Sequence, residues 1–365
     1  MTAVARIRSG EDSDADQLIA LIGACWALYP GVRMDVDGEM PELRALASYY
    51  ARAGGALWVA EDAGTVLGMA ATRPSEAAPS LAPHDEPTLQ AVAWEICRVY
   101  VHPSQHGSGL AHRLVDAAEA HAIAARATRL VLWSDTRFDR AHRFYEKRSY
   151  VRAGPIRVLH DISNSLEFSY AKPVSGIDVL DAAAAASAER RLADILIACV
   201  AGGAGVSFLP PLAPETARAF WKRATTEIAA GTQRLLCGWV DGVLVGTVTL
   251  HIGTPPNAPH RAEVQKLLVH PEARRHGLAR ALMQRVELEA ARAGRSMLTL
   301  DTRAGHAAER LYRAMGWQEG GRIPGYALNA DGSPGDTVFF WKTLSPAAER
   351  PGVTEASHTA PRVAP

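Results

Sequence analysis

Residues 95–111 read EICRVYVHPSQHGSGLA and residues 263–279 read EVQKLLVHPEARRHGLA, so two stretches of this chain repeat each other. Subtracting 95 from 263, or 111 from 279, gives the same offset of 168 residues. Each copy has a glutamate, an apolar strand that ends in Val-His-Pro, a short link, and a Gly-Leu-Ala that begins a helix. A constant offset over several ordered features indicates a duplicated unit. We therefore predict that the chain folds as two copies of one domain.

A second pair of matching segments follows the first in each half. Residues 134–137 (SDTR) parallel residues 300–303 (LDTR), and each segment is followed by an Arg-apolar-Tyr triplet that ends at Tyr145 or Tyr312. The spacing from the aspartate to the tyrosine is ten residues in one copy and eleven in the other. One residue was therefore gained or lost after the duplication.

The expected elements occur in the same order in both halves. For the first half the patterns predict strands and helices at 3–8, 12–28, 39–53, on both sides of the turn 62–64, and at 93–101, 109–126, 129–134 and 138–147, before a final strand pair. For the second half they predict elements at 182–200, 214–230, a hairpin across the favoured turn dipeptide Asp241-Gly242, and 263–269, 277–293, 296–301, 305–315 and 337–343. A mixed sheet flanked by helices in each half is an α/β architecture.

The chain passes from one copy to the next around residues 171–177. We expect one domain at 1–172 and a second at 173–345. Residues 346–365 are rich in Pro, Ala and Ser without periodicity, which predicts a disordered tail. Two domains also fit the length of 365 residues, because single cores stop growing below that size.

The composition is that of an ordinary soluble protein, with 48% hydrophobic and 21% charged residues. Because 39 basic residues balance 39 acidic ones, we expect neither nucleic acid nor a membrane as partner. The four cysteines lie far apart without metal-ligand spacing, which favours reduced thiols. No signal peptide or membrane span is visible, so the expected location is the cytoplasm. No metal-binding pattern occurs among the histidines.

The junction between strand and helix is the most informative segment for chemistry. A turn that begins a helix leaves backbone N–H groups unpaired, and the helix dipole adds positive character there. In the second copy Gly277 and Ala279 allow close approach of a ligand, and Arg274 and Arg275 can add charge. The segment therefore predicts a site for a diphosphate. A solvated basic turn before an ordinary helix is the alternative for a single loop, and its occurrence in two copies favours the ligand site.

Arg274-x-x-Gly277-x-Ala279 resembles the acetyl-CoA diphosphate signature Q/R-x-x-G-x-G/A of the GNAT family of N-acetyltransferases. The resemblance covers nearly the whole chain as two tandem domains. It implies that each domain is a mixed, mostly antiparallel sheet with a splayed parallel strand pair and flanking helices. The second copy resembles the tabtoxin-resistance type at residues 208–212, 263–267, 300–302 and 323–326. The first copy departs from the signature, because His106 stands where Arg or Gln is usual.

The resemblance implies that acetyl-CoA lies in the cleft between the splayed strands. Its pantetheine arm would pair with the backbone of the strand before the loop, and its diphosphate would contact the loop. The residues implied in the second copy are Leu267, Leu268, Val269, Arg274, Arg275, His276, Gly277, Leu278, Ala279 and Arg280. Those implied in the first copy are Val99, Tyr100, Val101, His106, Gly107, Ser108, Gly109, Leu110 and Ala111.

Acetyl transfer also needs a base for the amine, because an alkylammonium is no nucleophile at pH 7. Glu263, with Glu95 as its counterpart, is a candidate base on the cleft side of its strand, although a glutamate at a strand start is commonly solvated or ion-paired. By resemblance Tyr312, and Tyr145 in the first copy, would protonate the leaving thiolate. The alternative for both tyrosines is packing on the inner face of a short helix.

Two aspartates, Asp301 and Asp135, could orient the amine or equally cap the next helix. The resemblance implies an acetyl-CoA-dependent N-acetyltransferase that acts on a primary amine of an amino-acid-like or antibiotic-like small molecule. The second copy is expected to be the more competent centre, in a monomer or homodimer. Three alternatives stay open: both copies are active, the first copy only senses acyl-CoA or serves as a scaffold, or the acceptor is a peptide or protein amine.

Overall fold

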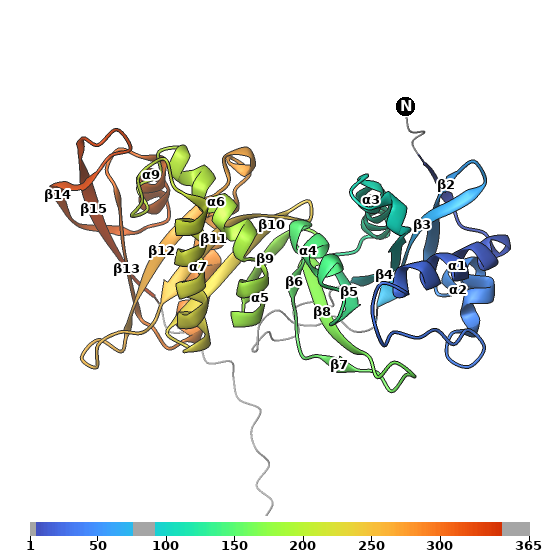
Figure 1. Cartoon of the computed structure of the whole chain (residues 1–365). Coiled ribbons are helices and arrows are strands. Elements are labelled where there is room, and N and C mark those ends of the chain that lie inside the picture. The colour runs from blue at the N-terminus through green and yellow to red at the C-terminus, as the bar shows by residue number, and fades with distance from the viewer. Residues whose placement is uncertain (1–4, 76–91, 345–365) are drawn as a thin grey trace, which may run out of the picture.

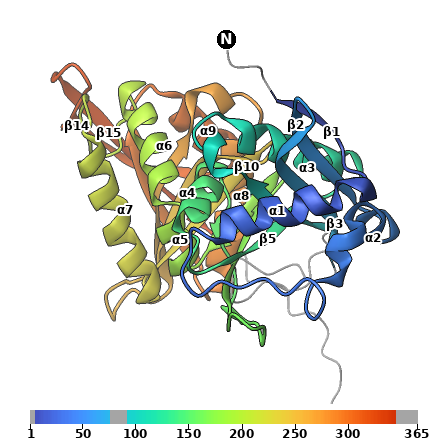
Figure 2. The same cartoon turned by 45° about the vertical axis from the view of Figure 1, so that its right-hand side comes forward.

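The computed structural model describes residues 5–75 and 92–344 (Figure 1). The predicted tail at 346–365 and the first residues of the predicted strand at 3–8 lie outside this part. The chain forms two sheets, one in each half, each covered by helices on its faces (Figures 1 and 2). This confirms the predicted pair of tandem α/β domains. Within the described residues, no helix combines the length and the apolar character needed to cross a membrane.

The first sheet has the order β1-β2-β3-β4-β5-β8-β6, with β7 paired to β8. Helices α1 and α2 lie against one face of it and α3 and α4 against the other. The elements of this half are β1 (Arg6–Ser9), a 3-10 turn (Asp12–Asp14), α1 (Ala15–Trp26), a 3-10 turn (Pro41–Ala45), α2 (Leu46–Arg52), β2 (Ala56–Asp62), β3 (Thr65–Ser75), β4 (Ala93–Val101), a 3-10 turn (Pro103–Gln105), α3 (Leu110–Ala124), β5 (Arg129–Asp135), α4 (Asp139–Lys147), β6 (Val151–Arg152), β7 (Arg157–Val158) and β8 (Leu166–Pro173).

The second sheet repeats this plan in the order β9-β10-β11-β12-β13-β15-β14. Its elements are β9 (Gly176–Leu180), α5 (Ala182–Ser187), α6 (Glu189–Ala201), α7 (Pro214–Ala229), β10 (Gln233–Val240), β11 (Val243–His251), β12 (Arg261–Val269), a 3-10 turn (Pro271–Ala273), α8 (Leu278–Arg292), β13 (Met297–Arg303), α9 (Ala307–Ala314), β14 (Gln318–Leu328) and β15 (Pro334–Thr343).

Three features of the second half differ from the expected elements. The helix predicted over 182–200 is divided into α5 and α6. Ala188 lies at the break, where it is the C-cap of α5 and the N-cap of α6. Strand β8 continues to Pro173 and strand β9 begins at Gly176, so the ends of two strands lie in the expected link at 171–177. Strand β14 is exposed along nearly its whole length, so it lacks the alternating burial that identifies a strand in sequence.

One of the hydrophobic cores is built by both halves. Val131, Val151 and Ala171 of the first sheet pack in the same cluster as side chains of α5, α6 and α7. Helix α5 lies between the two sheets in Figure 1. Polar contacts add to this interface: Trp239 donates from Nε1 to the carbonyl of Ser149 at 3.1 Å. The helices that cover one face of the second sheet therefore rest on the first sheet as well.

Candidate active site

The second sheet opens where its two parallel strands part. β12 pairs with β13 only from Arg261 to Glu263, although both strands continue well beyond that point. On its other side β12 carries a bulge, where Lys266 takes the left-handed backbone conformation with φ of 50°. The bulge turns the strand and leaves backbone groups of β12 without a neighbour in β13. A cavity of about 720 Å³ lies at this opening, lined by both strands, the α6–α7 loop, the start of α8, and α9.

The loop before α8 forms one end of the cavity. Gly277 has φ of 81° and directly precedes the helix, and Arg275 has φ of 70°. Within the described residues, the backbone N–H groups of 275–280 have no backbone or side-chain acceptor. Six adjacent free donors at a helix N-terminus form a cradle for an anion. The loop before α8 is therefore open, and its backbone donors are available to an anion.

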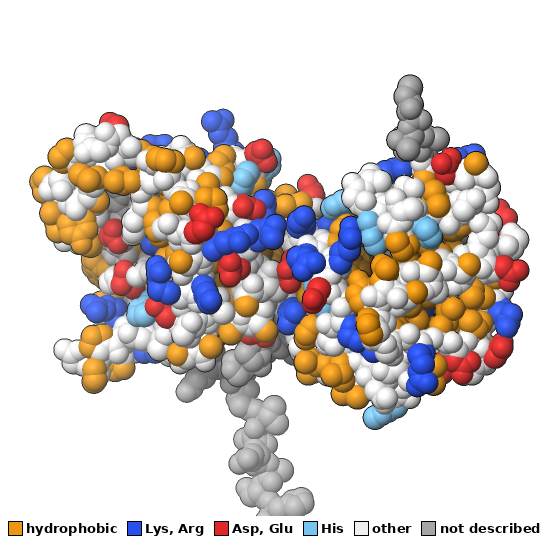
Figure 3. Space-filling view, viewed as in Figure 1, with side chains coloured by type: hydrophobic (Ala, Val, Ile, Leu, Met, Phe, Trp, Pro, Cys, Tyr) orange, Lys and Arg blue, Asp and Glu red, His pale blue; other side chains and the backbone are white. Residues whose placement is uncertain are grey.

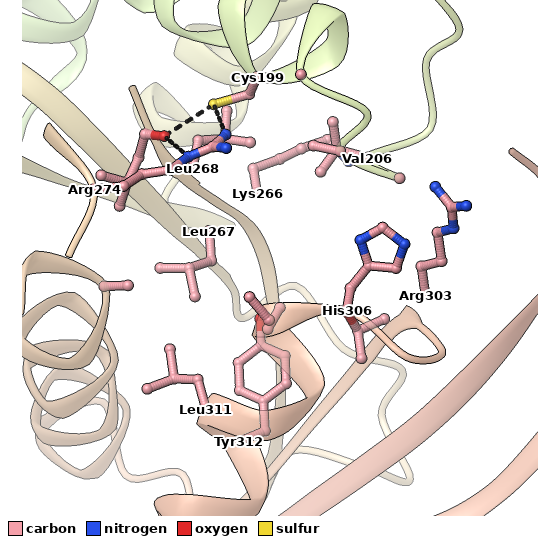
Figure 4. A pocket seen from close by; sticks show the side chains of 18 of the residues that line it. Cys199, Val206, Lys266, Leu267, Leu268, Arg274, Arg303, His306, Leu311 and Tyr312 are labelled. Atoms are coloured by element: carbon pink, nitrogen blue, oxygen red, sulfur yellow. Dashed lines mark hydrogen bonds between the residues drawn. The ribbon is translucent and has the colours of Figure 1, made fainter. Parts of the chain in front are cut away.

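Arg274 closes the same end of the cavity from the side. Its Nε donates to the carbonyl of Val269 at 3.1 Å, and its guanidinium reaches the sulfur of Cys199 (Figure 4). The Cys199 thiol donates to the same carbonyl at 3.4 Å. The carbonyl of Val269 is thus already occupied by protein donors.

The other end of the cavity is polar and carries both signs of charge. Arg303 lies there, Lys266 lies between Arg303 and Arg274 in Figure 4, and Glu263 and Asp301 line the same cavity. Asp301 keeps contact with solvent, yet burial of its carboxyl and the nearby charge of Glu263 raise its pKa, and the Lys266 ammonium partly opposes this. Burial lowers the pKa of Lys266, against the effect of Asp301 and Glu263. The Glu263 carboxylate accepts a hydrogen bond from Gln265 at 2.9 Å.

Tyr312 comes from α9 and points toward the centre of the cavity (Figure 4). Its ring packs against those of Trp317 and Phe340, and the distance between ring centroids is 6.0 Å in both pairs. The side chain is buried, and burial followed by the charge of Asp301 raises the pKa of its hydroxyl. The hydroxyl has no hydrogen-bond partner within the described residues. Its ring is held by packing and its hydroxyl faces the cavity.

The first half has the same backbone plan. β4 pairs with β5 only from Ala93 to Glu95, and Arg98 occupies the bulge with φ of 53°. The side chains differ, because here the charged groups neutralise each other. Glu95 forms an ion pair with Arg73 at 2.8 Å. Arg98 forms one with Glu42 at 2.6 Å.

The first loop also offers fewer free donors than the second. The N–H of Ser108 donates to the carbonyl of Gln105 at 3.2 Å, and the Ser108 hydroxyl accepts from the N–H of Leu110 at 3.3 Å. In the second loop His276 stands at the position of Ser108. Gly107 and Gly109 keep the left-handed conformation, with φ of 84° and 82°. The backbone shape is therefore retained while part of the anion cradle is already satisfied.

Aromatic side chains further fill the first cleft. Tyr100 stands where the second copy has Leu268, and its hydroxyl accepts from Trp26 Nε1 at 3.1 Å. The Tyr100 hydroxyl also lies close enough to Tyr145 to add to the effect of burial, which raises the pKa of Tyr145. Val99, Val101, His106 and Ala111 keep their predicted places on β4, the loop and α3.

The strand register corrects one equivalence drawn from the sequence motifs. Glu95 lies opposite Val131 and Glu263 opposite Thr299, so Trp133 occupies the place of Asp301. Asp135 lies two residues further along its strand, where it is held by Arg137 in an ion pair of 2.5 Å. The SDTR and LDTR segments match in sequence, but in the structure SDTR lies two residues further along its strand than LDTR does. The first half has no carboxylate at the position of Asp301.

Sequence reasoning missed two parts of the site. The α6–α7 loop supplies cavity residues from Gly202 to Ser207, and no pattern in that loop signals a ligand. Lys266 and Arg303 were not selected, although the alternation along β13 places Arg303 on the same face as Asp301. Among the described residues, no group of three or more His, Cys, Asp or Glu side chains is arranged to hold a metal ion.

Comparison with known proteins identifies one family. The model of the acetyltransferase (GNAT) family matches residues 22–150 and 206–317, which together make up more than half of the chain. An uncharacterized N-acetyltransferase from the hisH-hisA intergenic region of Azospirillum brasilense is 33% identical over 137 residues, which cover 36% of this chain and 80% of that protein.

Solved structures with a similar fold share less sequence with this chain. The yncA protein of Salmonella typhimurium, solved with its cofactor acetyl-CoA, is 20% identical with a TM-score of 0.40 and covers 52% of this chain and 99% of its own. The ribosomal-protein-alanine N-acetyltransferase of Brucella melitensis is 23% identical with a TM-score of 0.38, covering 44% of this chain and 96% of its own.

Proposed function

Because the chain belongs to the GNAT family of acetyltransferases, we propose that its C-terminal half transfers the acetyl group of acetyl-CoA to a primary amine of a small molecule. The observation that carries this proposal is an open anion cradle at one end of a cavity that also contains a tyrosine hydroxyl and two carboxylates without an ion pair among the described residues. The first half shares the fold but has neither feature in this form.

In this proposal the diphosphate of acetyl-CoA binds the free N–H groups of 275–280, with Arg274, Arg275 and Arg280 at the rim. The pantetheine arm runs along β12 past Leu267, where the strand has lost its parallel neighbour. This places the thioester near the point at which the strands part. A backbone N–H near Leu267 or Leu268 would stabilise the developing oxyanion.

The chemistry requires one proton to leave the amine and one to reach the departing thiolate. We assign the first task to Glu263, directly or through a water, because it lies at the start of the opening on the cavity side of β12. Asp301 orients the ammonium beside it. Tyr312 donates the second proton, because its hydroxyl faces the cavity and has no hydrogen-bond partner within the described residues. No metal takes part in these steps.

We assign the N-terminal half a scaffold role. Its counterparts of the proposed catalytic groups are Glu95, which is ion-paired, and Tyr145, which lies against Tyr100. In this proposal the N-terminal unit spans 1–172 and the C-terminal unit 173–345; β8 of the first sheet ends at Pro173 and β9 of the second begins at Gly176. The shared core then explains why the N-terminal unit is retained.

A turnover assay tests the proposal. The full chain is mixed with acetyl-CoA and a panel of primary amines, and free CoA and acetylated amine are measured together. We expect at least one small amine to yield both products in equal amounts. If no amine yields product and the chain binds no CoA species, the proposed function is wrong. Acetylation of protein amines alone would instead support the alternative acceptor class.

A further inference from the structure

The cavity contains four charged side chains of the second sheet. Leu298 and Leu300 of β13 and Ala262 and Val264 of β12 face the core under α8, so the side chains at the alternate positions face the opposite side. These alternate positions include the carboxylates of Glu263 and Asp301 and the cation of Arg303, and Lys266 from the bulge lines the same cavity.

None of these four groups forms an ion pair within the described residues, although they line one cavity. This differs from the first half, where Arg73, Glu42 and Arg137 neutralise the charges around the cleft. Glu263, Lys266 and Arg303 are half-buried, whereas Asp301 is exposed, so three of the four charges are partly withdrawn from water. Such charges are normally paired, because burial of a lone charge is unfavourable. Two cations and two anions that line one cavity without an ion pair therefore indicate a ligand that supplies the missing partners.

The two cations have contacts of their own, and neither forms an ion pair within the described residues, although Lys266 lies within electrostatic reach of Asp301 and Glu263. Arg303 Nη1 donates to the carbonyl of Gly203 at 3.4 Å, which tethers one edge of the guanidinium to the α6–α7 loop. Lys266 Nζ lies 3.4 Å from the hydroxyl of Ser207 and 5.4 Å from the centroid of the Phe220 ring. Both cations thus face the same loop, and the remaining guanidinium donors of Arg303 are free within the described residues.

Figure 4 shows that Arg303 and Arg274 lie at different ends of the cavity. His306 lies beside Arg303, and burial together with the charge of Arg303 lowers its pKa. The diphosphate cradle at 275–280 lies at the Arg274 end. Arg303, together with Lys266, is therefore available for an anion other than the diphosphate.

We propose that the acceptor is bipolar: it carries a carboxylate or similar anionic group in addition to its amine, and Lys266 and Arg303 bind that anion. The inference rests on the proposed acetyl transfer and deepens it. Glu263 and Asp301 receive the ammonium group, and the opposite charges of the acceptor match the four side chains in pairs. Lys266 and Arg303 are then specificity-determining residues that discriminate amino-acid-like amines from simple amines.

A matched panel tests this inference in the full chain. Phenylalanine, lysine and methionine are compared with their uncharged carboxamides and with the amines that lack the carboxylate. We expect turnover of at least one amino acid, with kcat/KM about 10- to 100-fold above both neutral analogues, because these analogues leave a charged group of the cavity unpaired. Arg303→Ala and Lys266→Met should each raise KM for that amino acid about 10- to 100-fold and reduce the preference.

The affinity for acetyl-CoA, measured by calorimetry, shows whether Lys266 and Arg303 bind the anionic group of the acceptor or the phosphates of acetyl-CoA. We expect it to stay unchanged in Arg303→Ala and Lys266→Met. Arg310→Ala is the matched control, because Arg310 lies on α9 outside the cavity and its loss should change neither parameter. A loss of acetyl-CoA affinity without a change in the acceptor KM would assign these cations to CoA and overturn the inference.

Two further outcomes also overturn it: neutral analogues that react as well as the amino acids, or no turnover of any amino acid. In either case retained binding of acetyl-CoA leaves the proposed function standing. If the chain binds no acetyl-CoA, the proposed function itself fails. Thermal melting of each variant shows whether the fold is intact.

Discussion

Two tyrosines, Tyr312 and Tyr145, occupy the same place in the duplicated fold. Each packs against the side chain five residues further on and against an aromatic residue of the neighbouring strand. Of the two, Tyr312 lines the large cavity, near Asp301, whose carboxylate forms no ion pair among the described residues. The two halves therefore share a backbone and differ in single side chains around it. The same substitution at Tyr312 and at Tyr145 compares the two halves directly.

Tyr312→Phe should lower kcat about 100-fold or more, because general acid catalysis contributes roughly 10²- to 10⁴-fold. Its melting temperature should stay close to that of the unchanged protein, because the lost hydroxyl has no hydrogen-bond partner within the described residues. Steady-state kinetics and thermal melting measure the two effects. Tyr145→Phe is the control and should keep full activity. A loss of activity in Tyr145→Phe alone would place the chemistry in the N-terminal half and contradict the proposal.

The pH dependence of turnover tests the charges around Asp301. Its pKa lies above the ordinary value of 3.8 through burial and Glu263, and the Lys266 ammonium lowers it in part. Loss of that ammonium should therefore raise the pKa of Asp301 further. We expect the acidic limb of kcat/KM to move to higher pH in Lys266→Met and to lose the Asp301 titration in Asp301→Asn. An acidic limb that is identical in all three proteins contradicts a role for Asp301.

At the level of elements, both halves use one device: a bulged strand followed by a left-handed residue that begins a helix. Gly109 and Gly277 have φ of 82° and 81°, and a Cβ at either position would meet no other atom. The cost of a side chain at either position is therefore the strain of the left-handed backbone, about 1–2 kcal/mol for an L-residue. Its effect on a ligand depends on whether the N–H groups that follow are used.

Gly277→Ala should weaken acetyl-CoA binding about tenfold, because relief of the strain rotates the N–H groups of the cradle. Calorimetry measures the change in Kd. Gly109→Ala should lower the free energy of unfolding by a similar amount and leave Kd unchanged, because we place no diphosphate on that loop. Equal losses of affinity in both variants would show that both loops bind the cofactor.

Much of the element order could be predicted from sequence, and the reasons for the misses are physical. β4 has the bounds 93–101 that the repeat predicts, because its motif begins at a glutamate and ends at Val-His-Pro. β14 was missed because its side chains are exposed, so no burial pattern marks it. The equivalence of Asp135 with Asp301 was wrong because similar letters do not fix a strand register, which backbone pairing decides.

The site itself was only partly visible in the sequence. The diphosphate loop follows from local rules for glycine and helix termini, so it could be predicted from adjacent residues. Arg303 and Lys266 are recognised as site residues because they form no ion pair among the described residues. Ion pairing depends on tertiary contacts, which the sequence does not show. The neutralisation of Glu95 by Arg73 is likewise invisible without the pairing of β3 with β4.

Across the whole molecule, the two halves share a core instead of touching at a polar surface. Val151 and Ala171 of the first sheet lie in one cluster with Leu192, Leu196 and Trp221 of the second half. Burial of apolar side chains contributes about 1.5–3 kcal/mol each for the larger ones. The α6–α7 loop, which lines the acceptor end of the cavity, is thus anchored on a layer that the first half completes.

A shortened chain that starts at Val174 should therefore be unstable. We expect it to aggregate or to melt without a cooperative transition, because the faces of α5, α6 and α7 that meet the first sheet would be exposed to water. Calorimetric melting and analytical ultracentrifugation measure this. A monomeric, cooperatively folded fragment that binds acetyl-CoA as tightly as the full chain would show that the first half is no scaffold.

The most direct test of the difference between the two halves is the number of acetyl-CoA molecules bound per chain, measured by isothermal titration calorimetry. We predict one site per chain, lost or strongly weakened when Arg274, Arg275 and Arg280 are all changed to alanine and unaffected when His106 is changed to alanine. Two sites of similar affinity, or a single site that survives the triple change and disappears with His106→Ala, would contradict a donor site confined to the C-terminal half.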